Sequence, residues 1–305
     1  MKKIVLVLLA TVFLSHPAAQ AADKIRVVAT MNTLGEFTQK IMGDEAEIHV
    51  VAKLGRDIHF IQPTPKDVLK VKKAEVLVHS GLDLEAWRQP LLNAAGNTDF
   101  LGSSEKAVDA SQGIELLEVP AILSRSEGDL HIFGNPHYWT DPANAEQMVR
   151  NIASGLSRIY PESAARYQAN AETLIHQIHT AAADWDRRLA PYKGTAIVTY
   201  HKSWPYFAKR FGFDIIGYLE PKPGIPPTAK HLQEIERLIK EKNARMLIKE
   251  TYNEKRPAEK VTRESGIPLV TLLQFSGDEK TNGYIGMMDE NVKRIEEALG
   301  GGLRS

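Results

Sequence analysis

The sequence predicts an α/β protein of two lobes, each with a mostly parallel sheet flanked by helices, joined by one long rigid helix. Two groups of short β-branched runs alternate with stretches of helical periodicity, and such alternation is typical of βαβ units. A stretch of helical pattern without strand runs separates the two groups. The length of 305 residues also suits two domains better than one.

The N-terminus has the pattern of a cleaved signal peptide over residues 1–21. Met1 to Lys3 is positively charged, an apolar run follows to Leu14, and Ala19-Gln20-Ala21 has the small residues that signal peptidase recognises. The apolar run is shorter than the roughly 20 residues that a membrane span needs. We therefore expect a secreted, periplasmic protein whose mature chain starts at Ala22.

The N-terminal lobe is expected over residues 22–141. Its strands and helices are expected in alternation, with strands at 25–30, 48–52 and 76–79 and helices at 33–42 and 64–73.

A connecting helical segment is expected over residues 142–190. Asp141 followed by Pro142 is typical of an N-cap and a first helical turn. No proline or glycine occurs between Pro161 and Pro191, so the second helix should be long. At about 1.5 Å per residue it forms a rod of about 39 Å, and a rod of this length joining two lobes should resist large hinge closure.

The C-terminal lobe is expected over residues 191–305. Four strands at 196–200, 213–217, 244–248 and 269–273 share β-branched, apolar sequences, and a helix at 231–242 lies between the second and third.

Composition restricts the kinds of site that the chain can build. It has no cysteine, which excludes disulfides, thiolate metal sites and a lipid-modified N-terminal cysteine, so a metal must be held by His, Asp or Glu. Lysine plus arginine and aspartate plus glutamate are 38 each. A nucleic-acid partner is not expected, because it would normally require a basic excess.

Three histidines lie where strands or short loops should end. His201 directly follows the expected strand at 196–200, and ligands of α/β proteins lie outside the carboxyl ends of parallel strands. His59 and His137 have prolines nearby, which stiffen a loop and reduce the entropy lost when it presents a ligand. The three are scattered along the chain and form no compact metal motif, so spacing alone leaves the site a hypothesis.

Several long motifs occur along the chain: His59-Phe-Ile-Gln-Pro-Thr-Pro-Lys-Asp67, Gly134-Asn-Pro-His-Tyr-Trp-Thr-Asp-Pro142, Tyr200-His201, Glu220-Pro-Lys-Pro-Gly224-Ile-Pro-Pro-Thr228 and residues 284–291. Through these motifs and their order, the chain resembles the zinc/manganese solute-binding proteins of ABC transporters (cluster A-I) over nearly its whole mature length, and most of all the zinc-binding members.

The resemblance implies a metal site between the lobes, with His59, His137 and His201 at the first three ligand positions. Three imidazoles suit Zn²⁺ better than Mn²⁺, which prefers carboxylates, so zinc is expected and manganese is the alternative. The family's fourth ligand is usually an Asp after the last core strand. That loop is shorter here; Asp278 is our choice, with Glu250 or water as alternatives.

The implied function is to capture zinc and deliver it to an ABC membrane permease with its ATPase, without catalysis, as a monomer. Two alternatives remain: a zinc-dependent hydrolase or lyase, and a metal-binding adhesin or interaction protein. The His-rich loop that some zinc-specific members carry before the second ligand is absent. His131 stands in that region, and we expect it to support the site or face solvent rather than to bind the metal.

Overall fold

The computed structural model describes residues 23–100, 104–120, 131–222, 224–277 and 281–300. The predicted signal peptide and Asp278 lie outside these residues. Among the residues described, no helix is both long and apolar enough to cross a bilayer.

The N-terminal sheet is parallel throughout, with the strand order β2-β1-β3-β4. Its strands are β1 (Ile25–Ala29), β2 (Ala46–Val50), β3 (Val76–His79) and β4 (Ala107–Asp109), and its helices are α1 (Asn32–Met42), α2 (Pro65–Lys73) and α3 (Arg88–Ala95). The sequence patterns identified every one of these elements except α3 and β4. Both are short, and three residues are too few to show a strand period.

The C-terminal sheet repeats this topology with the order β6-β5-β7-β8, again all parallel. Its strands are β5 (Ala196–Thr199), β6 (Asp214–Tyr218), β7 (Met246–Glu250) and β8 (Leu269–Leu272), and its helices are α6 (Pro205–Phe211), α7 (Ala229–Lys242) and α8 (Lys255–Ser265). The predicted fold class of two parallel-sheet lobes is therefore confirmed.

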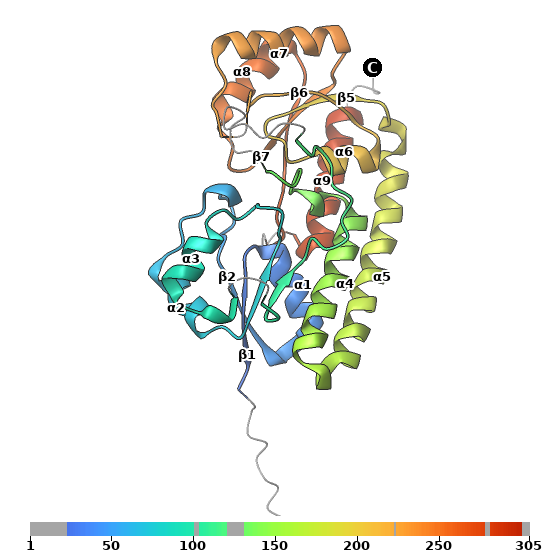
Figure 1. The fold of residues 1–305 in the computed structure, drawn as a ribbon. Helices are drawn as coiled ribbons and strands as arrows, with labels where there is room; N and C mark the ends of the chain where they lie inside the picture. The colour runs from blue at the N-terminus through green and yellow to red at the C-terminus, as the bar shows by residue number, and fades with distance from the viewer. Residues whose placement is uncertain (1–22, 101–103, 121–130, 223, 278–280, 301–305) are drawn as a thin grey trace, which may run out of the picture.

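Three long helices, α4 (Pro142–Ile159), α5 (Ala164–Leu189) and α9 (Gly283–Gly300), lie on one side of the molecule, and α5 runs beside both lobes (Figure 1). The Asp141 side chain accepts a hydrogen bond from the Ala143 amide at 2.9 Å and so caps α4. At 26 residues, α5 is about 39 Å long. Gly155 lets α4 approach the sheet closely, because a Cβ there would lie 2.7 Å from the Val108 methyl groups.

The two lobes also share buried apolar packing. One continuous core contains β1 and β3 residues together with residues of β5, β7 and β8. Trp139, in the segment before α4, donates its indole N–H to the Gln274 carbonyl after β8 at 2.7 Å. The long helix and this shared core together oppose large rotations between the lobes.

Candidate metal centre

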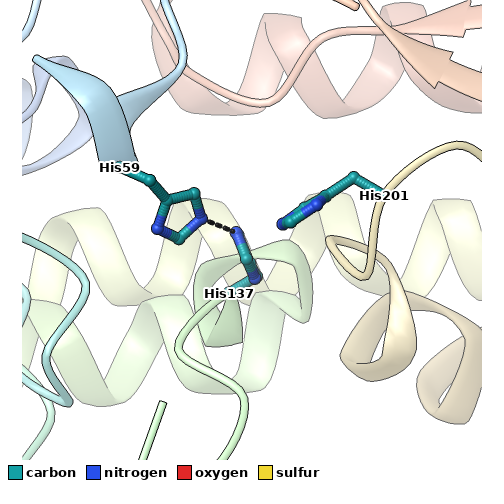
Figure 2. A group of neighbouring side chains, drawn as sticks. All are labelled: His59, His137 and His201. Atoms are coloured by element: carbon teal, nitrogen blue, oxygen red, sulfur yellow. Dashed lines mark hydrogen bonds between the residues drawn. The ribbon is translucent and has the colours of Figure 1, made fainter. Parts of the chain in front are cut away.

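Three histidines meet between the carboxyl ends of the two sheets (Figure 2). His59 lies in a 3-10 turn (Ile58–Phe60), His137 precedes another (Tyr138–Thr140), and His201 follows β5. One ring nitrogen from each lies within 4.8 Å of the others, and the Nε2 atoms of His59 and His137 are 3.1 Å apart. The structure therefore brings together the three histidines that the sequence singled out.

The spacing of the rings matches a tetrahedral ion. With a Zn–N distance of about 2.0–2.1 Å, a ring centroid lies roughly 3.2 Å from the metal, so centroids at two tetrahedral corners are about 5.2 Å apart. The measured centroid separations are 5.1 Å for His59 and His137, 5.3 Å for His137 and His201, and 5.4 Å for His59 and His201. The spacing of the three rings is thus compatible with three corners of one tetrahedral ion.

The backbone around His59 is held on both sides. The Asp57 carboxylate accepts the His59 amide N–H at 3.0 Å, and the Trp87 indole donates to the Ile58 carbonyl at 2.7 Å. Ile58 is fully buried. These contacts fix the turn, and the ring also makes a hydrogen bond with the Leu84 backbone.

His137 is oriented by Asn135. The Asn135 Oδ1 atom lies 3.0 Å from both the backbone nitrogen and the ring Nδ1 of His137, and accepts from both. The Asn135 amide group in turn donates to the Lys202 carbonyl at 2.7 Å and to the Glu118 carboxylate at 2.9 Å. A proton held on Nδ1 leaves the Nε2 lone pair of His137 free for a metal.

His201 is oriented by a carboxylate. Its Nδ1 atom lies 2.6 Å from Oε2 of Glu220, in the loop after β6. A carboxylate behind a ligating histidine fixes the tautomer and makes the opposite nitrogen a stronger donor. Nothing in the sequence connected these two residues, which stand 19 positions apart.

The surroundings of the three histidines shift their pKa values. Burial, followed by neighbouring histidine charge, holds the pKa values of His59 and His137 well below their usual range. Burial also acts to lower the pKa of His201, but the hydrogen bond to Glu220 and the charges of nearby carboxylates outweigh it and raise that pKa. His59 and His137 are therefore neutral at pH 7, the form of imidazole that can bind a metal.

Glu250, the alternative fourth ligand, is fully buried at the end of β7. Its Oε1 atom accepts from the Trp204 indole at 2.9 Å, and burial raises its pKa to about 7. It is not part of the group of ligand atoms formed by the histidines. Asp278 lies outside the described residues, but the chain leading to it is anchored near His137 by the bond from Trp139 to Gln274.

His131 lies beside the three histidines, in agreement with the first of the two positions expected for it, supporting the site rather than facing solvent. Its ring centroid is 4.9 Å from that of His59 and 6.4 Å from that of His137. Burial, followed by the charge of His201, lowers its pKa to about 4. Only its position six residues before His137 hinted at this placement.

Replacing Glu220 with glutamine tests the carboxylate behind His201. Glutamine keeps an acceptor for Nδ1 but removes the charge, so zinc affinity at pH 7 should fall by about 10- to 100-fold. The pKa of His201 should also fall, which moves the onset of proton competition to lower pH. Calorimetric zinc titrations between pH 5 and 8 measure both effects; an unchanged affinity and pH profile would contradict this role for Glu220.

Comparison with known proteins places the chain in a family. A family model described as "Zinc-uptake complex component A periplasmic" matches residues 27–298. The chain belongs to this family. The match extends from β1 to within α9 and so includes both lobes and all three histidines.

Two curated relatives and one solved structure are similar to this chain. The zinc-binding protein AdcA of Streptococcus pyogenes serotype M18 (strain MGAS8232) is 26% identical over 314 residues, which cover 96% of this chain but only 61% of the relative. The iron-binding protein YfeA of Yersinia pestis is 27% identical, over 92% of this chain and 88% of the relative. A crystal structure of ZnuA has the same fold, with a TM-score of 0.77, 24% identity and coverage of 90% of this chain and 99% of that one.

Proposed function

We propose that this protein captures Zn²⁺ reversibly between its two lobes and delivers it to an ABC import permease and its ATPase. The observation that carries the proposal is the set of three converging imidazoles with the ring spacing of a tetrahedral ion. His59, His137 and His201 are the proposed protein ligands. The family's description as a periplasmic component of zinc uptake supports both the compartment and the task.

The donor set favours zinc over other divalent ions. The relatives differ in the metal that they are named for, zinc in AdcA and iron in YfeA, so their names do not decide the cargo. Neutral imidazoles suit zinc, whereas Mn²⁺ prefers oxygen ligands. We propose Asp278 as the fourth ligand because the segment leading to it is anchored beside His137.

The proposed division of the chain is a signal peptide (1–21), an N-terminal lobe (22–141), a connecting helical segment (142–190) and a C-terminal lobe (191–305). The positions of the two sheets and of α4 and α5 support these boundaries. We propose that the mature protein acts as a monomer and without catalysis. Turnover of a test ester or of CO2 well above that of free zinc would instead favour the hydrolase or lyase.

Calorimetric titration of the metal-free mature chain with Zn²⁺ and with Mn²⁺, separately at pH 7, tests the proposal. We expect one zinc per chain, submicromolar affinity, about 8 kcal/mol or more of binding free energy, and much weaker manganese binding. Comparable manganese affinity would indicate that carboxylates complete the site. If neither metal binds, the capture function is wrong.

A further inference from the structure

A fourth histidine has an unused donor atom beside the proposed ligands. The Nε2 atom of His131 is buried and has no hydrogen-bond partner among the described residues. The nearby Asp83 backbone acts to raise the pKa of this histidine, but burial and the charge of His201 outweigh it. A buried lone pair without a partner is unfavourable, so the arrangement calls for a group that uses this atom at some stage.

Neighbouring backbone groups orient His131 and His59 together. His131 bonds to the Asp83 backbone and His59 to that of Leu84. Each of these backbone contacts acts to raise the pKa of its histidine, as a nearby carbonyl oxygen does. One short segment of chain therefore aligns the outer histidine with a proposed ligand.

That segment is a strained turn held in place by buried contacts. Gly81, Leu82 and Asp83 have φ angles of 73°, 53° and 57°, and such angles are uncommon for residues with a side chain. The buried Glu85 carboxylate accepts hydrogen bonds from the Ser80 amide at 2.9 Å and the Ser80 hydroxyl at 2.8 Å. Strain maintained in this way is typical of functional segments, and here the end of the turn lies beside the imidazoles of His59 and His131.

The four histidines differ in exposure. His131 and His59 are partly exposed, whereas His137 and His201 are 1% and 5% exposed. His131 does not stand at the fourth tetrahedral corner, because its centroid is 6.4 Å from that of His137 and the corner requires about 5.2 Å. It is adjacent to the site on the side of His59.

We propose that His131 is a transfer ligand, which binds the incoming zinc together with His59 before the ion moves to His137 and His201. This inference rests on the proposed function. The His131 imidazole replaces a water on the hydrated ion, and His137 and His201 then displace His131 and remaining water while His59 stays bound. No step strips the ion of all its protein ligands, so exchange in both directions has a lower barrier. His131 is absent from the resting site and affects the rates more than the affinity.

Stopped-flow kinetics on His131→Gln and His131→Ala tests this pathway. Glutamine lacks the imidazole lone pair but keeps an amide that can still contact the Asp83 backbone. The glutamine variant therefore removes the zinc-binding nitrogen without removing the polar contact with the turn at residues 81–83. Association is followed by mixing the metal-free chain with zinc, and dissociation by mixing the zinc-loaded chain with excess chelator. His176→Ala, at an exposed position on α5, is the matched control.

For both variants we expect association and dissociation to slow by the same factor, on the order of tenfold, which corresponds to a barrier higher by about 1.4 kcal/mol. The dissociation constant and the absorption spectrum of the Co²⁺-loaded protein should stay those of the wild type. Dissociation that is unchanged or faster overturns the proposal. Unchanged rates would mean that zinc enters by another route, such as the cavity of about 300 Å³ lined by Asp57, Glu220 and Glu254. Faster dissociation together with an altered Co²⁺ spectrum would mean that His131 is a ligand in the resting site. Failure of the wild-type chain to bind zinc would reject the capture function itself.

Discussion

Replacing His137 with alanine should weaken zinc binding at pH 7 by about a thousandfold or more. Loss of a residue that merely supports a ligand costs about 10- to 100-fold, and His137 is itself one of the proposed ligands, so its loss should cost more. It is 1% exposed, its Nδ1 proton is held by Asn135, and its Nε2 atom lies 3.1 Å from that of His59. Competition titration with a zinc chelator of known affinity gives the ratio of dissociation constants.

Two control variants separate loss of a ligand from a general disturbance. His176→Ala removes an exposed histidine of α5 and should leave zinc affinity unchanged. Asn135→Ala keeps the imidazole of His137 but removes its orientation, so its effect should be smaller, about 10- to 100-fold. If His137→Ala binds zinc within a few-fold of the wild type, the site is not built on these three histidines.

Replacing Trp139 with alanine should destabilise the metal-free protein by about 3–5 kcal/mol, the usual cost of removing a large buried aromatic side chain. Trp139 is fully buried, and its ring stacks on Phe275 with 5.5 Å between the centroids. Its indole donates to the Gln274 carbonyl at 2.7 Å. The free energy of urea unfolding, with the slope held common to both proteins, measures the loss.

Trp139→Phe distinguishes the contribution of the indole N–H from that of packing. Phenylalanine retains a stacked ring but leaves the Gln274 carbonyl without this donor, so it should cost less than alanine, about 1–3 kcal/mol from the unpaired carbonyl in addition to the lost volume. Equal losses in the two variants would show that the hydrogen bond dominates. A loss below about 1 kcal/mol for Trp139→Ala would contradict the inference that this side chain joins the lobes.

The sequence alone determined the features that depend on local chemistry. Asp141 before Pro142 marked the start of α4, and the absence of proline and glycine after Pro161 marked α5 as one long helix. The runs of β-branched residues marked the sheets, because strand and helix periods are properties of neighbouring residues. The three histidines were also singled out from the sequence, but their joint role came from resemblance to a family rather than from their spacing.

The tertiary structure alone decided which distant groups meet. Glu220 pairs with His201 and Asn135 with His137, and His131 lies against His59 with its Nε2 atom unpartnered. The left-handed backbone of Leu82 and Asp83 also went unanticipated, because residues with side chains rarely adopt it without surrounding contacts. The charge, the tautomer and the available lone pair of each histidine depend on the groups within a few ångströms of its ring. Those distances are set by the packing of the two lobes against each other.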